Sequence, residues 1–179
     1  MNKMIIKTAC ALLCAALMLS AASCGSGEEV SVPSGMKLCS SADVDYYFYV
    51  PDQWIGDIST GIASAYYSQS DRSNVSMEAF ELEEAYTSVP DFWAGYAADF
   101  AATFSDMEYI TEGESMIVSD IAAYKYVYTA TVTGTQYQFM QIAAIKAGIV
   151  YIFTYTALPD KYESHVDEVD YMIGQIVIK

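Results

Sequence analysis

The stretch "YKYVYTATVTGTQYQFMQIAAIKAGIVYIFTYTA", residues 124–157, decides the fold. Apolar and aromatic side chains recur at every second residue, the pattern of strands whose side chains alternate between two faces of a sheet. Two short turns, "TGT" at 133–135 and Ala147-Gly148, interrupt this pattern. Three consecutive strands joined by short turns predict an antiparallel meander.

Both faces of this meander carry apolar side chains, so we expect both to be covered. We assign to one face Tyr124, Tyr126, Tyr128, Ala130, Val132, Tyr137, Phe139, Gln141, Ala143, Ile145, Tyr151, Phe153 and Tyr155. We assign to the opposite face Val127, Met140, Ile142 and Ile152.

Upstream of the meander the sequence predicts further strands and a helix. "DYYFYVP" (45–51) is a strand stopped by Pro51, and the segments 62–69 and 75–83 form a hairpin around the polar loop 70–74. Ser88 offers an N-cap hydroxyl, followed by a proline and an acid in the first turn. The helix that follows places five aromatic residues on one arc: Phe92, Trp93, Tyr96, Phe100 and Phe104.

The C-terminal segment predicts one helix and a short strand. Pro159-Asp160 opens the helix, whose buried stripe consists of Tyr162, Val166, Val169 and Ile173, and "IVIK" (176–179) is the closing strand. The predicted fold class is therefore α+β, a twisted antiparallel sheet flanked by helices. The helices lie either one on each side of the sheet or both on one face.

The N-terminus has the organisation of a secretory signal peptide over residues 1–23. Lys3 and Lys7 precede an apolar run (9–22) that is shorter than the roughly 20 residues needed to span a bilayer. Ala21-Ala22-Ser23-Cys24 resembles the bacterial lipobox, although Ala21 stands where leucine is commonest. The resemblance implies that Cys24 carries a diacylglycerol anchor with palmitate-type chains. A plain secreted protein and a retained anchor helix are the alternatives.

Composition limits the partners of the processed chain. Cleavage removes both leader lysines and changes the formal charge from −15 to −17 over 156 residues. So acidic a chain lacks the basic surface that nucleic acid or anionic lipid headgroups require. We expect a lipidated Cys24 with a flexible tether over 24–42, one domain over 43–179, and a location on the extracytoplasmic face of the cell membrane.

Cys39 is the single cysteine left after the leader and Cys24 are accounted for, so no internal disulfide is possible. We expect an inert, partly buried thiol there, with an intermolecular bridge as the alternative.

The aromatic strand that runs into Pro51 and Trp54 resembles the PsbP-like superfamily, as does "GIVYIFTYTALPDKY" (148–162) followed by a helix and a strand. That superfamily includes the extrinsic photosystem II protein, a Ran-binding import factor, and bacterial lipoproteins of the DcrB and LpqN kind. The resemblance covers about residues 43–179. It implies a non-catalytic α/β/α sandwich that supports assembly or binding, and no functional residue carries over.

Few residues suit catalysis or metal binding. The one histidine, His165, is interpreted as a helix-rim residue that pairs with Glu168, and one histidine with one spare cysteine cannot fill a zinc site. We therefore expect no cofactor, no metal and no catalytic residue. Three carboxylate clusters keep a calcium site or a carboxylate-dependent hydrolase open as alternatives: Glu81, Glu83 and Glu84; Glu112 and Glu114; and Asp167, Glu168 and Asp170.

Two sets of residues are candidates for a contact surface. Neighbours in a strand point to opposite faces, so at least one ring of each pair, Tyr46-Tyr47 and Tyr66-Tyr67, faces either the second layer or solvent. The small residues Gly95, Ala98 and Ala102 share the outer side of the first helix. The leading hypothesis is a membrane-anchored adaptor with a protein partner in the cell envelope. A small-ligand or cation-binding module is the alternative, and a hydrolase the third.

Overall fold

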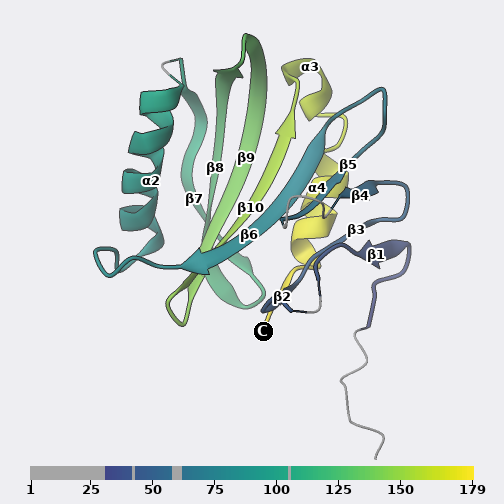
Figure 1. Cartoon of the computed structure of the whole chain (residues 1–179), viewed down its shortest axis with the longest axis horizontal. Helices are drawn as coiled ribbons and strands as arrows, with labels where there is room; N and C mark the ends of the chain where they lie inside the picture. Colours follow the sequence, from purple (N-terminus) through teal and green to yellow (C-terminus); the bar gives the residue numbers. More distant parts are fainter. Residues whose placement is uncertain (1–30, 42, 58–61, 105) are drawn as a thin grey trace, which may run out of the picture. The chain divides into compact units, whose positions relative to one another are not determined.

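A seven-stranded antiparallel sheet is the centre of the fold in the computed structural model (Figure 1). The structure describes residues 31–41, 43–57, 62–104 and 106–179, so the predicted signal peptide and the predicted lipidation site Cys24 lie outside the described residues. The strands run in the order β4-β5-β6-β10-β9-β8-β7. Their bounds are β4 Ile55–Asp57, β5 Ala63–Tyr66, β6 Asn74–Glu81, β7 Glu108–Val118, β8 Ile121–Val132, β9 Thr135–Lys146 and β10 Ile149–Ala157. The predicted meander is β8-β9-β10, and the α+β class is confirmed.

The third strand of the meander has the opposite phase to the one we predicted. Ile152 lies opposite Ala143 and Phe153 opposite Ile142, so Tyr151, Phe153 and Tyr155 share a face with Ile142 and Met140. The cause is the tight turn at Ala147-Gly148, where both φ angles are positive and Lys146 pairs with Ile149. Across such a two-residue turn each odd-numbered residue pairs with an even-numbered one. The odd-numbered residues of β10 therefore lie on the same face as the even-numbered residues of β9.

Helix α2 (Val89–Thr103) covers part of one sheet face. Trp93 packs against Tyr126 and Tyr128, and Phe92 packs against Val150 and Ile152. The predicted cap is present, because the Ser88 side chain accepts a hydrogen bond from the backbone N–H of Asp91.

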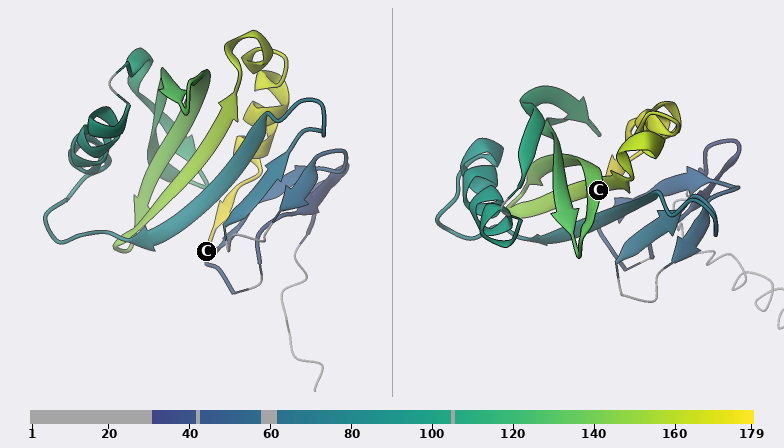
Figure 2. Two further views of the ribbon diagram at one scale, coloured as in Figure 1. Left: turned by 45° about the horizontal axis from the view of Figure 1, so that its top comes forward. Right: turned by 90° about the horizontal axis from the view of Figure 1, so that it is seen from above.

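The other face is covered by short elements from both ends of the folded unit. They are β1 (Met36–Leu38) paired with β3 (Tyr49–Pro51), β2 (Tyr46–Tyr47) paired with β11 (Val177–Ile178), and the helices α3 (Pro159–Tyr162) and α4 (Val166–Gly174). The Tyr162 ring lies 5.0 Å from Tyr155, and Phe48 lies 5.8 Å from Phe153. Because Phe153 and Tyr155 point away from α2, the helices lie on opposite faces, well apart in both views of Figure 2.

The last helix is two helices and not the single one predicted. The chain leaves α3 after Tyr162 and enters α4 at Val166, with His165 as N-cap at a φ of −122°. This break turns the His165 side chain inward, where 5% of the residue is exposed.

The folded unit begins earlier than Asp43. Strand β1 lies within the segment assigned to the tether, and residues 32–179 pack as one unit. Cys39 is buried and its thiol donates to the Ser64 carbonyl at 3.1 Å. Burial raises the pKa of this thiol to about 11, against a smaller opposing effect of Lys37, so it is the inert thiol expected. None of the helices formed by the described residues is long and apolar enough to cross a membrane.

Candidate functional site

A groove of about 650 Å³ runs between α2 and the strands β7 and β8. We call it the α2–β7 groove. It is lined by Pro90, Trp93, Ala94, Ala97, Ala98, Met107, Tyr109, Glu112, Gly113 and Tyr126. Its walls are therefore mainly apolar and aromatic, with one carboxylate among them.

Three aromatic residues form the fixed wall of the groove. The Trp93 and Tyr126 rings are stacked, with centroids 3.7 Å apart and planes 6° apart. Trp93 Nε1 donates to the Tyr109 hydroxyl at 3.0 Å, which ties the helix to the edge strand. Burial raises the pKa of Tyr126 to about 12, so its phenol stays neutral at physiological pH. The side-chain charge of this lining is thus that of Glu112.

An irregular edge strand forms the opposite wall. The pairing of β7 with β8 shifts register between Tyr109 and Glu114, and Gly113 has a φ of +73°. A side chain other than glycine would be strained there. The bulge leaves Glu112 exposed on the groove side, and Ile110, in the same bulge, is 60% exposed.

The structure separates the small residues that we placed together on α2. Ala98 is exposed and lines the groove. Gly95 does not, because a Cβ atom added at Gly95 would overlap the Tyr86 ring. Its lack of a side chain therefore serves an intrachain contact and not an outside partner. The prediction for the Ala102 side chain lies outside the described part of the structure.

The predicted tyrosines also have different environments. The prediction that Tyr46 is a contact residue is wrong, since Tyr46 is 3% exposed and its hydroxyl donates to the Met77 carbonyl at 2.8 Å. Tyr67 packs on His165 with centroids 4.2 Å apart. Tyr47 is half-buried beneath the Lys179 ammonium, and Tyr66 is half-buried in a second pocket described below.

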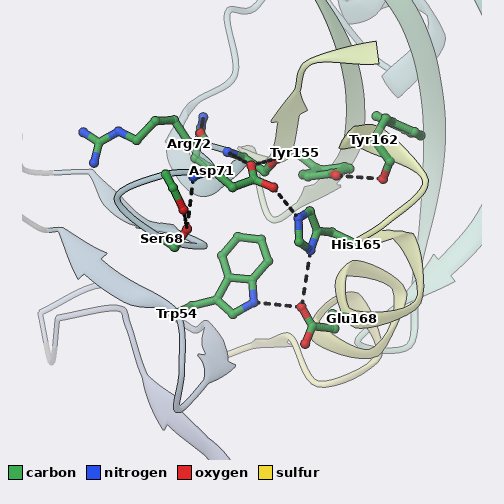
Figure 3. A network of polar contacts seen from close by, with 11 residues as sticks. Trp54, Ser68, Asp71, Arg72, Tyr155, Tyr162, His165 and Glu168 are labelled. Atoms are coloured by element: carbon green, nitrogen blue, oxygen red, sulfur yellow. Dashed lines mark hydrogen bonds and ion pairs between the residues drawn. The ribbon is translucent and has the colours of Figure 1, made fainter. Parts of the chain in front are cut away.

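His165 joins a loop and a helix that are far apart in the sequence (Figure 3). Its Nε2 lies 3.1 Å from Asp71 Oδ2 in the β5–β6 loop, and its Nδ1 lies 3.8 Å from Glu168 Oε2. Glu168 also accepts hydrogen bonds from Trp54 Nε1 at 3.0 Å and Gln53 Nε2 at 2.7 Å. The predicted pairing with Glu168 is present, but His165 is a buried bridge and not a rim residue.

The Asp71 carboxyl is the acidic end of this bridge. Burial alone would raise its pKa, but hydrogen bonds from Ser73 and His165 outweigh that effect and lower the pKa to about 2. Ser73 contributes both its hydroxyl, at 2.7 Å, and its backbone N–H, at 3.0 Å. The bridge therefore holds the loop in one conformation by charge and hydrogen bonding together.

The carboxylate clusters do not converge on one point. Glu81, Glu83, Glu84, Glu112, Glu114, Asp167 and Asp170 are exposed, and Glu114 pairs with Lys125 at 2.8 Å. Among the described residues, no group of three or more histidine, cysteine, aspartate or glutamate side chains is placed to hold a metal ion.

This architecture is a PsbP-like fold. It matches cyanobacterial PsbP (CyanoP) from Synechocystis sp. PCC 6803 with a TM-score of 0.61 and 17% identity, covering 87% of this chain and 99% of that one. PA94 of Pseudomonas aeruginosa, a protein of unknown function, matches with a TM-score of 0.55 and 15% identity, covering 80% of this chain and 97% of that one. LpqN of Mycobacterium tuberculosis, involved in cell envelope biogenesis, matches with a TM-score of 0.51 and 14% identity, covering 83% of this chain and 81% of that one. No protein-family model and no curated protein matches the sequence.

The sequence analysis named two residues of this groove, Ala98 as a contact residue and Glu112 in a carboxylate cluster, but did not bring them together. Trp93 was predicted on the aromatic, sheet-facing side of the helix. Tyr109 lies in β7, a strand that the sequence analysis did not predict. One signal was available: Glu112-Gly113-Glu114 interrupts an alternating segment, and an isolated glycine in a strand often marks a bulge.

Proposed function

We propose that the protein is a lipid-anchored extracytoplasmic lipoprotein whose folded unit is a non-catalytic adaptor domain. In this proposal the α2–β7 groove binds a basic, extended segment of a protein partner in the cell envelope. The observation that carries it is the groove itself, a mainly apolar and aromatic channel beside an edge strand.

Charge argues for a basic partner. The chain has a formal charge of −15, and Glu112 places a carboxylate in the groove wall. Glu108 adds a carboxylate on the same exposed strand, whereas Glu114 already pairs with Lys125 at 2.8 Å. A lysine or arginine of the partner would lay its apolar stem along Ala94 and Ala98 and direct its charge toward Glu112.

The state of the two reactive side chains supports a non-catalytic role. His165 is buried between two carboxylates, and the Cys39 thiol is buried with a raised pKa. Neither is presented to a substrate together with a second reactive group, as nucleophilic catalysis requires.

Site-specific photocrosslinking in cells tests this proposal. A photoreactive residue replaces Ala98 in the full-length lipidated chain, and a matched control replaces exposed Asp160 on α3. We expect position 98 alone to capture one recurrent envelope protein through a segment rich in lysine or arginine. Capture of the same proteins from both positions would contradict the proposal.

A binding measurement then checks the chemistry of the contact. A synthetic peptide with the captured sequence should bind the full-length protein with an affinity that falls as salt rises. Glu112→Lys should weaken binding about tenfold or more, because it replaces attraction by repulsion. Glu163→Lys, which makes the same charge change at an exposed position next to α3, should leave it nearly unchanged. Equal effects of the two substitutions would show that the groove is not the binding site.

A further inference from the structure

A second pocket, of about 440 Å³, lies on the same sheet face as α2, over the part of that face that α2 leaves uncovered. We call it the Tyr66–Arg72 pocket. It is lined by Asp57, Ser64, Ala65, Tyr66, Arg72, Asn74, Val132, Thr133, Tyr137, Phe139 and Thr156. None of these residues belongs to α2, which stands beside the other end of the sheet in Figure 1. The expectation that both sheet faces are covered therefore fails here.

One row of side chains crosses four adjacent strands at this pocket. Tyr66 on β5 pairs with Asn74 on β6, Asn74 with Thr156 on β10, and Thr156 with Phe139 on β9. Neighbouring strands lie about 4.8 Å apart, so the two aromatic residues stand about 14 Å apart with an amide and a hydroxyl between them. A hydrogen-bonding floor with an aromatic ring at each end suits a pyranose, which can pack an apolar face on one aromatic ring and turn its polar edge toward the floor.

Arg72 adds a positive charge at one wall. It is the sole arginine of the sequence, and its Cζ lies 4.2 Å from the centroid of the Tyr66 ring. Its Nη1 contacts the neutral Gln69 side chain at 3.3 Å, and no ion pair to it occurs among the described residues. A guanidinium stacked on a ring still presents its N–H fork to a planar carboxylate.

The loop that carries Arg72 is held in place from the other side. Asp71 binds His165, and backbone bonds from Tyr67 to Ser73 and from Ser68 to Asp71 close the loop at 2.8 and 2.9 Å. Figure 3 shows the Arg72 side chain pointing away from His165. The guanidinium is thus positioned before any ligand arrives, which lowers the entropic cost of binding.

We propose that the Tyr66–Arg72 pocket binds a sugar acid, a pyranose with a single carboxylate. The carboxylate pairs with Arg72, the sugar ring lies over the floor between Tyr66 and Phe139, and its hydroxyls bind Asn74, Thr156 and Asp57. A carboxylate accepts up to about four hydrogen bonds, so Asp57 receives ligand hydroxyls in addition to its contacts within the chain.

The charge of the domain limits the ligand to one carboxylate. A single anionic group gains a close contact with Arg72, whereas further carboxylates would meet a strongly acidic surface. A polymer with a carboxylate on every residue is therefore excluded by the proposal, and a monomer fits.

The test uses the full-length protein in detergent and three probes: D-galacturonate, neutral D-galactose and trigalacturonate. Binding is measured by ligand-observed NMR and titration calorimetry. We expect D-galacturonate to bind about tenfold more tightly than D-galactose and at least as tightly as trigalacturonate. Arg72→Gln should remove the preference for the acid and leave D-galactose binding nearly unchanged.

The matched control is Lys179→Gln, because Lys179 also places a cation 4.2 Å from a tyrosine ring, that of Tyr47, away from the pocket. It should keep the preference for D-galacturonate. Equal binding of acid and neutral sugar, stronger binding of the trimer, or no saturable binding of any probe would each overturn the proposal. These outcomes do not depend on the α2–β7 groove, so they leave the adaptor proposal to its own test.

Discussion

At the scale of single residues, His165 illustrates how a charged contact can organise a loop. Its ring lies between Asp71 and Glu168 and contacts the Trp54 and Tyr67 rings at centroid distances of 5.8 and 4.2 Å. A buried imidazole needs partners for both nitrogens, and these two carboxylates lie next to them. The result is a fixed β5–β6 loop, which presents Arg72 to the second pocket.

Asp71→Asn should reduce stability in a pH-dependent way. The folded-state pKa of Asp71, about 2, lies below its ordinary value of 3.8. A lowered carboxyl pKa contributes stability that is fully present above pH 3.8 and is lost as the pH falls through 2. Its side chain is 18% exposed, so we allow for solvent screening and expect a loss of about 1–2 kcal/mol at pH 6.

Urea unfolding of the wild type and the variant between pH 6 and pH 1.5 checks this prediction. The difference in free energy of unfolding should shrink below pH 4. Asp170→Asn, which changes an exposed carboxylate on α4, is the control and should have little effect at any pH. A loss for Asp71→Asn that is constant across the range would mean that shape and not charge matters at this position.

At the scale of elements, α2 has three different sides. Phe92 and Trp93 face the sheet, Ala94 and Ala98 face the groove, and Gly95 faces Tyr86. Tyr86 lies in the segment before the helix, and its ring contacts Phe92 at a centroid distance of 5.9 Å. The segment between β6 and α2 therefore packs against the helix through the Tyr86 ring, which occupies the space beside Gly95.

Gly95→Ala should therefore destabilise the protein although alanine is the better helix former. We expect a loss of about 1 kcal/mol, because the new Cβ displaces the Tyr86 ring. In a Tyr86→Ala background the same substitution should stabilise by about 0.5–1 kcal/mol, the ordinary gain in helix propensity. Thermal and urea unfolding of the four proteins of this cycle measure the coupling. An equal stabilisation in both backgrounds would show that Tyr86 does not occupy this space.

At the scale of the whole molecule, the fold places its two candidate binding sites on the same side of the central sheet. The α2–β7 groove lies at the β7 edge, and the Tyr66–Arg72 pocket lies toward the β4–β5 edge. Both contain aromatic side chains, but the carboxylate of Glu112 marks the first and the guanidinium of Arg72 the second. The second pocket also contains the carboxylate of Asp57, so the two sites differ in the arrangement of their charges. Different charge arrangements favour different ligands, so one domain can serve two contacts.

Membrane anchoring is a prediction about Cys24, which lies outside the described residues. Cys24→Ser should move the protein from the membrane fraction to the soluble fraction of cells, because it removes the proposed diacylglycerol attachment site. Cys39→Ser, which changes the buried thiol, should leave the protein with the membrane. Fractionation followed by metabolic labelling with a palmitate analogue measures both. A Cys24→Ser protein that stays firmly in the membrane would rule out the lipobox.

The sequence by itself determined the class of fold and its local elements. The alternation over 124–157 identified the meander, and Ser88-Val89-Pro90-Asp91 identified the start of α2. These features depend on residues within a few positions of one another. The two-residue period of apolar side chains and the chemistry of the helix N-cap are therefore sufficient to predict them.

Only the tertiary structure decided the register and the sites. The phase of β10 depended on how one tight turn pairs Lys146 with Ile149, and the sequence pattern on both faces was apolar. Asp71 contacts His165 across 94 residues, and strand pairing brings Tyr66 and Phe139 into one row across two intervening strands. Such contacts arise when separate elements pack and align, and a shift of one residue in a strand turns every side chain to the other face.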